Sequence, residues 1–178
     1  DETIRKYGLG WAPANRTTFL EKARAAGYKE EYLLDTGLCK QYEDGRIVRN
    51  IRPGGYVLGD EGSGVYLGKA FLADFVKGML PAHIEADFVA ETGLDYALVV
   101  RKVYKEPAAS AFMASLAPFI MSKSDDPYVA GLVGSCLESF VNRALVRYSD
   151  DASDRDAARR VGVVGSFGCV CRPFLEKI

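Results

Sequence analysis

The sequence predicts an α/β fold in which a small mixed sheet is covered by many helices. Residues 38–51 read as two strands around a turn at 43–45, a pattern typical of a β-hairpin. Residues 128–148 carry apolar side chains at helical spacing over about five turns, which indicates a buried helix face. Residues 161–168 form a short apolar run that reaches a glycine-serine turn before a final helix. Strands and helices that share one core favour a layered α/β arrangement.

The other elements follow from apolar periodicity and from the glycines and prolines that interrupt it. In chain order we expect short helices at 2–7, 17–26 and 29–35, hairpin strands at 38–42 and 46–51, a strand at 56–58, and helices at 65–80, 82–91 and 96–104. A further helix from about Ala108 should bend or stop at Pro118, since proline lacks the N–H of a helical residue. The charged stretch 149–160 is expected to be a solvated loop or a short exposed helix.

Composition narrows the function classes. The 178 residues include 23 basic and 24 acidic side chains, so the net charge of −1 gives no long-range attraction to nucleic acid or to an anionic membrane. The longest apolar stretch, 111–121, is far shorter than the roughly 20 residues that a bilayer requires, and we expect no membrane span. No secretory signal is visible in the first residues, so the predicted location is the cytoplasm.

Cysteine and histidine usage does not favour a metal or a disulfide framework. The four cysteines are few and irregularly spaced, so reduced thiols are expected. The pair Cys169 and Cys171 has no second Cys/His pair to complete a tetrahedral metal site, and the predicted metal assignment is none. His83 is the sole histidine, and we expect it to have an ordinary packing role at a helix start.

A glycine-spaced acidic loop, 59–64, lies directly before the predicted helix 65–80. Glycines let the backbone approach a ligand closely, and the following helix offers free N–H groups. Asp60 and Glu61 can accept hydrogen bonds from hydroxyls. The loop is therefore expected to hold a polar ligand.

Five segments match one known family: 54–64, Leu67-Gly68-Lys69, Val103-Tyr104, 114–119 and Val164-Gly165-Ser166. Together they resemble the BadF/BadG/BcrA/BcrD ATPase and N-acetylglucosamine kinase family. The resemblance covers residues 47–178 and implies the C-terminal lobe of an actin-like, ribonuclease-H-like kinase fold. It implies that Asp60, Glu61, Gly62 and Ser63 are on the substrate side, facing a sugar or acyl small molecule. Gly165 and Ser166 are then on the nucleotide side, with ATP and Mg as the implied cofactors.

Residues 1–46 resemble a different family. Residues 2–13, 27–34, 36–38 and 43–46 are similar to the small helical region before the Toprim core of bacterial DNA primase. The chain is thus an apparent chimera, natural or designed, whose junction falls between Cys39 and Val48. The primase zinc ribbon and acidic core are not present in the sequence, so primer synthesis is not expected.

Three functions follow as hypotheses. The first is a nucleotide- and sugar-binding lobe that is not catalytic alone, because phosphoryl transfer needs groups that the family takes from an N-terminal lobe. The second is an interaction protein, or a self-associating one, with a partner surface near Trp11, Tyr28 and Tyr32 or around Phe112. The third, which the near-neutral charge disfavours, is nucleic-acid binding through basic side chains. Those side chains are Arg5, Lys6, Arg16, Lys22, Arg24 and Lys29.

Overall fold

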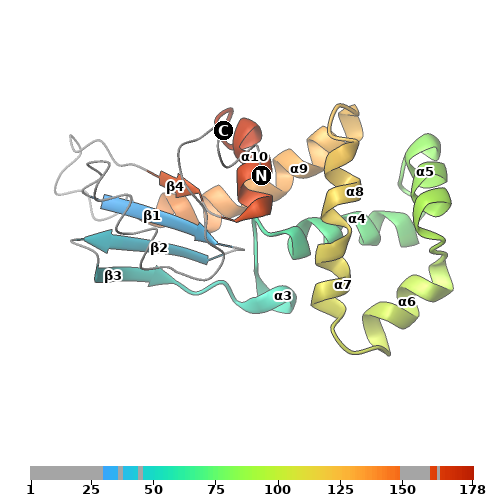
Figure 1. Cartoon of the computed structure of the whole chain (residues 1–178), viewed down its shortest axis with the longest axis horizontal. Helices are drawn as coiled ribbons and strands as arrows, with labels where there is room; N and C mark the ends of the chain where they lie inside the picture. Colours follow the sequence, from blue (N-terminus) through green and yellow to red (C-terminus); the bar gives the residue numbers. More distant parts are fainter. Residues whose placement is uncertain (1–29, 36–37, 44–45, 149–160, 164) are drawn as a thin grey trace.

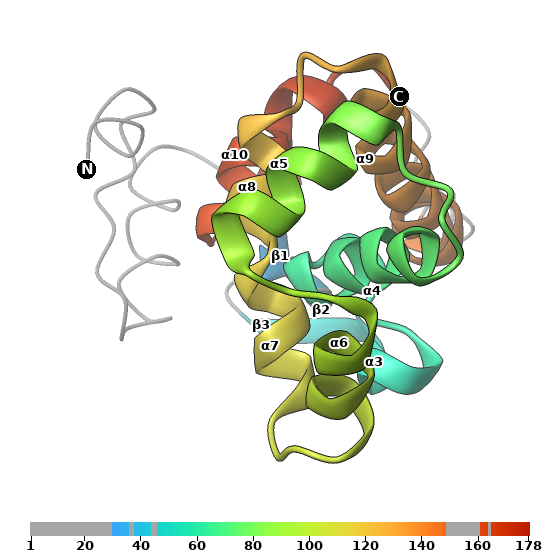
Figure 2. The same cartoon turned by 90° about the vertical axis from the view of Figure 1, so that its right-hand side faces the viewer.

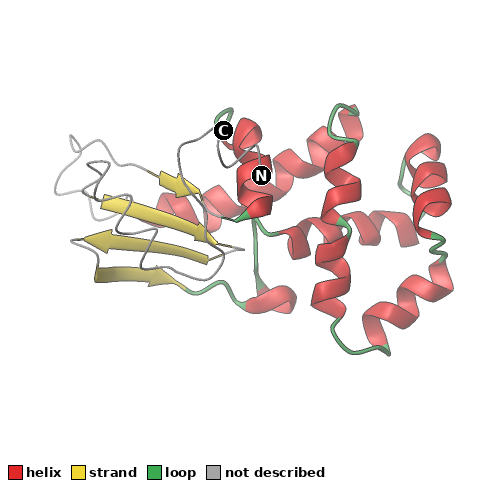
Figure 3. Cartoon of the chain, viewed as in Figure 1, coloured by secondary structure: helices red, strands yellow, loops and turns green. Residues whose placement is uncertain are grey.

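The computed structural model describes residues 30–35, 38–43, 46–148, 161–163 and 165–178. A small sheet lies on one side and a set of helices on the other (Figure 1), and the separation of strands from helices is plain in Figure 3. The helices predicted at 2–7 and 17–26, the stretch 149–160 and the six basic residues of the nucleic-acid hypothesis lie outside the described residues.

The sheet has four strands in the order β3-β2-β1-β4. They are β1 (Glu30–Asp35), β2 (Leu38–Glu43), β3 (Arg46–Ile51) and β4 (Val161–Val163). Strand β1 pairs antiparallel with β2, and β2 pairs antiparallel with β3. Strand β4 pairs parallel with β1. The predicted strands of the hairpin are therefore confirmed, as are the strand at 161–163 and the helix that begins at Ser166. The boundary predicted at residue 46 falls within this single sheet.

The helix predicted at 29–35 is wrong, because residues 30–35 form strand β1. Tyr32 pairs with Gln41 on one side and with Val161 on the other, so the segment is a central strand of the sheet. Pairing on both edges satisfies its backbone groups, and this tertiary context overrides the local helical pattern.

The helices are α3 (Gly55–Leu58), α4 (Gly64–Val76), α5 (Ala82–Thr92), α6 (Tyr96–Tyr104), α7 (Ala109–Ser115), α8 (Ala117–Ser122), α9 (Pro127–Phe140) and α10 (Ser166–Leu175). Helix α9 continues as a π-helical segment, η1 (Val141–Leu145), and a 3-10 turn, η2 (Val146–Tyr148). Most of these elements match the prediction. The predicted break near Pro118 is real, since α7 ends at Ser115 and Pro118 lies in the first turn of α8.

The strand predicted at 56–58 is also wrong, because these residues form the one-turn helix α3. Gly54 and Gly55 have φ values of 83° and 73°, a left-handed conformation that turns the chain away from the direction of β3. The Lys69 ammonium of α4 then donates to the Tyr56 carbonyl at 2.8 Å, which tethers α3 to the long helix.

Helix α4 is the centre of the main core. Phe71 is fully buried and meets Phe88 of α5 edge-on at a centroid distance of 5.1 Å, while Phe75 meets Phe88 at 4.9 Å. On the α7 side, a Cβ added to Gly68 would lie 2.0 Å from the Met113 carbonyl oxygen, so only glycine permits this close approach. Viewed from the helical end, α4, α5 and α9 surround this core (Figure 2).

Tyr148 at the end of the long helix connects the helices to the sheet. Phe140 and Tyr148 form a second buried cluster that includes Ile51 of β3 and Val163 of β4. The Ile51 N–H donates to the Tyr148 hydroxyl at 2.9 Å. The continuous helix Pro127–Tyr148 is long and apolar enough to cross a membrane by length and composition. Its residues Val129 and Val133 are fully buried in the main core, and 28% of its apolar window is buried inside the structure.

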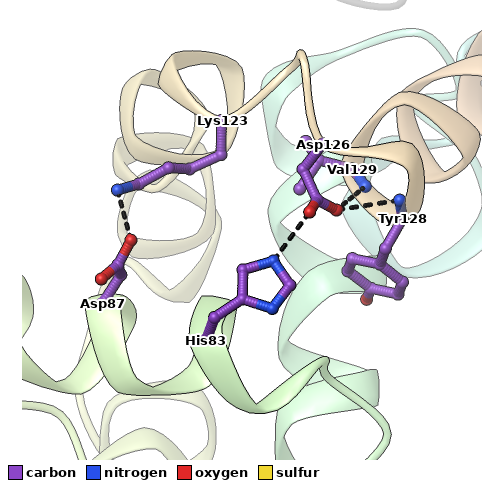
Figure 4. A network of polar contacts seen from close by, with 6 residues as sticks. All are labelled: His83, Asp87, Lys123, Asp126, Tyr128 and Val129. Atoms are coloured by element: carbon purple, nitrogen blue, oxygen red, sulfur yellow. Dashed lines mark hydrogen bonds and ion pairs between the residues drawn. The ribbon is translucent and has the colours of Figure 1, made fainter.

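Polar contacts tie the outer helices together (Figure 4). The Asp126 carboxylate caps α9 by accepting from the Tyr128 N–H at 2.9 Å, and it lies 2.7 Å from Nε2 of His83 in α5. The hydrogen bond with His83 is the main cause that lowers the pKa of Asp126. Lys123 donates to Asp87 at 2.6 Å, a contact that raises the pKa of the lysine. His83 therefore has a structural role, as its position at a helix start predicted.

Candidate functional site

The acidic loop 59–64 has a shape that its own backbone fixes. A Cβ on Gly59 would lie 1.8 Å from the Pro53 carbonyl oxygen, which itself accepts from the Asp60 N–H at 2.8 Å. Asp60 has a φ of 61°, the left-handed conformation that aspartate tolerates better than most residues. The Ser63 N–H closes the loop by donating to the Asp60 carbonyl at 3.1 Å. Backbone strain of this kind is concentrated at functional sites.

Two residues of the loop, Gly62 and Ser63, make contacts within the protein that fix the loop. Gly62 has a φ of 75°, and a Cβ there would lie 2.7 Å from Cγ of Phe140. Ser63 is 1% exposed, and its hydroxyl accepts from the Tyr66 N–H at 3.2 Å as the N-cap of α4. Both residues shape the loop, and direct ligand contacts from them stay a prediction.

Arg143 is a site neighbour that the sequence analysis missed. Its Nε lies 3.7 Å from Oε1 of Glu61, whose side chain is only 16% exposed. The two residues are far apart in the sequence, and no local pattern joins them. Arg143 follows Phe140, so the same end of the long helix that supports Gly62 brings a positive charge to Glu61.

The predicted nucleotide-side turn lies beside the acidic loop. Gly165 precedes α10 with φ 95° and ψ 153°, and Ser166 is the first residue of that helix. Within the described part of the chain, no side chain caps the α10 N-terminus. A Cβ on Gly64 would be 3.8 Å from the Phe167 ring, so the start of α10 and the end of the loop are in contact range. The first turn of α10 thus approaches the last residue of the acidic loop, and a shared ligand site at the two turns stays a prediction.

The described residues fit the phosphate of the implied ATP better than they fit the implied Mg²⁺ ion. The N-cap of α10 is Gly165, which makes no side-chain hydrogen bond to the first N–H groups of the helix, and a helix N-terminus suits a phosphate. The described residues contain no group of three His, Cys, Asp or Glu side chains that could hold a metal ion. Because Glu61 faces Arg143, the acidic loop alone does not fit a Mg²⁺ site.

The cysteines in the described core are not set up as nucleophiles. Cys136 and Cys171 are buried, and burial raises the pKa of each thiol to about 12. Burial also raises the pKa of Cys169. Thiols with raised pKa values stay protonated near neutral pH, so covalent catalysis by them is not supported.

The fold of the chain is similar to that of two solved structures. The structure superposes with a TM-score of 0.75 on a protein from Porphyromonas gingivalis titled "Putative N-acetylglucosamine Kinase", at 32% sequence identity. The chain is structurally similar to this kinase. A second protein of the same title, from Chromobacterium violaceum, has a TM-score of 0.62 at 21% identity, which shows the shared fold alone. The kinase resemblance and its actin-like ATPase fold are thus supported.

The extent of the match limits what it carries. It covers 87% of this chain and 54% of the P. gingivalis protein, so the chain spans about half the length of that protein. For the C. violaceum protein the corresponding shares are 97% and 72%. No protein-family model matches the chain, and no curated protein matches it. Neither structure is titled a primase, and the primase-like resemblance of residues 1–46 has no support beyond the sequence.

Proposed function

We propose that this chain is the nucleotide- and sugar-binding lobe of an N-acetylglucosamine kinase-like ATPase, and that it does not complete catalysis alone. Residues 47–178 form the C-terminal lobe in this proposal, and strands β1 and β2 complete its sheet. The observation that carries the proposal is the approach of α10 to the end of the acidic loop, where a Cβ on Gly64 would be 3.8 Å from the Phe167 ring.

Each turn supplies a different chemistry at this junction. The carboxylates of Asp60 and Glu61 can accept hydrogen bonds from sugar hydroxyls. The N–H groups at the N-terminus of α10, which the Gly165 N-cap does not cap, favour a phosphate together with the helix dipole. Phosphoryl transfer needs an acceptor hydroxyl and a phosphate held side by side, which is mainly a matter of positioning and charge.

Calorimetric titration tests the two halves of the site separately. The wild-type chain should bind ADP and N-acetylglucosamine. Asp60→Asn should weaken sugar binding about tenfold and leave ADP binding nearly unchanged, because a charge-assisted hydrogen bond is lost. Asparagine is chosen because it also tolerates the left-handed conformation of Asp60, so the loop keeps its shape. Ser166→Ala should weaken ADP instead.

Asp125→Asn is the matched control. Asp125 is exposed and lies just before the N-terminus of α9, whereas Phe140 contacts the loop from the other end of that helix. A helix of this length separates the two ends by about 20 Å. Equal sugar affinity in the wild type, Asp60→Asn and Asp125→Asn would contradict the assignment of the loop.

A second candidate function is partner binding through helix α3. Tyr56, Val57 and Leu58 are 38%, 68% and 83% exposed, an unusual row of apolar side chains for a free surface. Of the partner surface predicted from sequence, Trp11, Tyr28 and the Tyr32 side chain lie outside what the structure describes, and Phe112 packs against the core. Light scattering of the wild type and of Leu58→Ser tests self-association. A monomer in both cases removes self-association as the role of α3.

A further inference from the structure

The long helix changes its winding where it reaches the acidic loop. Helix α9 is regular as far as Phe140, which contacts Gly62, and the next five residues are π-helical. Such turns are rare and often occur at functional sites. Here the wider turn lets Val141, Ala144 and Leu145 all pack on the cluster of Phe140 and Tyr148.

Arg143 lies between these apolar positions, but its side chain is in solvent and contacts Glu61 of the acidic loop. Its side chain is 70% exposed, and its contact with Glu61 is long, at 3.7 Å from Nε to Oε1. Because the contact is long and the guanidinium is mostly in solvent, the ion pair contributes little to stability, so holding Glu61 does not explain the arginine. A guanidinium carries five N–H donors in a planar fork that matches a phosphate.

The surroundings of Arg143 complete an anion-binding chemistry. The uncapped N-terminus of α10 comes within contact range of the same loop through Phe167 and Gly64. The loop thus has a positive group on each of these sides, a helix N-terminus and an arginine. The carboxylates of Asp60 and Glu61 can bind the neutral hydroxyls of a ligand. Arg143 and the helix N-terminus can bind a phosphate of the same site.

We infer that Arg143 is a phosphate-binding residue that exchanges its contact with Glu61 for a phosphate of the bound ligand. The inference rests on the proposed sugar and nucleotide site and adds a residue to it. When the guanidinium turns to a phosphate, Glu61 is released to accept a hydrogen bond from a sugar hydroxyl. Two ligands offer this phosphate chemistry, namely a nucleotide and a phosphorylated sugar.

Calorimetry with three probes distinguishes these sources: ADP, N-acetylglucosamine 6-phosphate and neutral N-acetylglucosamine. Arg143→Met keeps the apolar stem and removes the charge, and it should weaken at least one phosphate-bearing probe about tenfold. The affinity of this variant for neutral N-acetylglucosamine should change less than about twofold, since losing an exposed side chain that does not touch the ligand has little effect. Arg143→Lys should restore part of the lost affinity, since it returns the charge without the fork.

Glu61→Gln should act in the opposite direction on phosphate. It frees the guanidinium, so the phosphate-bearing probe that Arg143→Met weakens should bind more tightly by a few-fold. Arg101→Met is the matched control, because Arg101 is 58% exposed and pairs with Glu106 at 2.9 Å, far from the loop on α6. This control should change none of the three affinities.

The outcomes separate this inference from the proposed function. A loss confined to ADP assigns Arg143 to the nucleotide, and a loss confined to the sugar phosphate assigns it to the sugar. Normal binding of all probes by Arg143→Met overturns the inference and leaves the proposed function intact. An equal loss for neutral sugar also overturns it, because Arg143 would then only support the loop. If the wild type binds none of the probes, both proposals fail.

Discussion

Replacing Gly62 by alanine tests whether Phe140 sets the shape of the acidic loop. The added Cβ would lie 2.7 Å from Cγ and 2.8 Å from Cβ of Phe140, closer than non-bonded carbons pack. Gly78 offers a matched control, because its φ of 65° resembles the 75° of Gly62 and nothing lies within 4 Å of its added Cβ. The two substitutions differ mainly in the steric contact.

The expected magnitudes follow from these two contributions. A left-handed alanine costs about 1–2 kcal/mol, partly offset by the reduced freedom of the unfolded chain. Gly78→Ala should therefore lower the free energy of unfolding by about 1 kcal/mol or less. Gly62→Ala adds overpacking of about 1–3 kcal/mol, because both the loop and the aromatic side chain must shift. For a chain of this size, that difference corresponds to a gap of about 2–12 °C in Tm.

Urea unfolding and thermal melting of both variants measure the gap. Phe140→Ala, made alone and with Gly62→Ala, provides a double-mutant cycle. The combined loss should be smaller than the sum of the single losses, since removing the ring gives the new methyl group room. Equal destabilisation by Gly62→Ala and Gly78→Ala, together with additive losses in the cycle, would refute the role given to Phe140.

Three further outcomes can be measured in the same way. Gly68→Ala should destabilise by several kcal/mol because its Cβ would lie 2.0 Å from an α7 carbonyl oxygen, whereas Gly131→Ala, with nothing within 4 Å, should stabilise α9 by about 0.5–1 kcal/mol. Burial raises the pKa values of Cys136 and Cys171 from 9.0 to about 12. The stability that the protonated thiols contribute is therefore complete below pH 9. It falls as pH rises toward 12, by about 1.4 kcal/mol per pH unit for each thiol. The double alanine variant should be less stable at pH 7 yet show a flatter alkaline profile in urea titrations. The lowered pKa of Asp126 means that its contribution is present above pH 3.8 and lost as pH falls through the folded value, so Asp126→Asn should flatten the acid side of the profile.

The sequence predicts best where one local pattern decides the element. The helices at 82–91 and 96–104 were predicted nearly to the residue, because proline, an N-cap aspartate and glycine mark their ends. The hairpin is equally local. Strand β1 was missed although its antiparallel pairing with β2 is just as local, because its sequence, EEYLLD, is rich in good helix formers. Its second edge pairs with residues 161–163, at the other end of the chain, which no local pattern shows.

The site shows the same division. The loop and the glycine-serine turn were found from the sequence, since glycine spacing and charge are local signals. Their approach was not, because it depends on α10 packing on α9, with the Phe167 ring near the start of α4. Arg143 carried no signal of its own, since the π-helical winding that exposes it depends on Phe140 and Tyr148 packing against the sheet.

Hydrogen exchange can test whether the loop, the turn before α10 and the π-helical segment respond to ligands as one site. Phe140 supports Gly62, Phe167 approaches Gly64, and Arg143 contacts Glu61, so these segments share packing contacts. Adding ADP and N-acetylglucosamine together should slow exchange in 59–64, 141–145 and 166–169, because ordering of one segment restricts the others. Helices α5 and α6 lie at the far end of the molecule and should keep their rates (Figure 1). Slower exchange in α5 and α6 alone would move the ligand away from the loop, and a uniform decrease would indicate general stabilisation instead of a shared site.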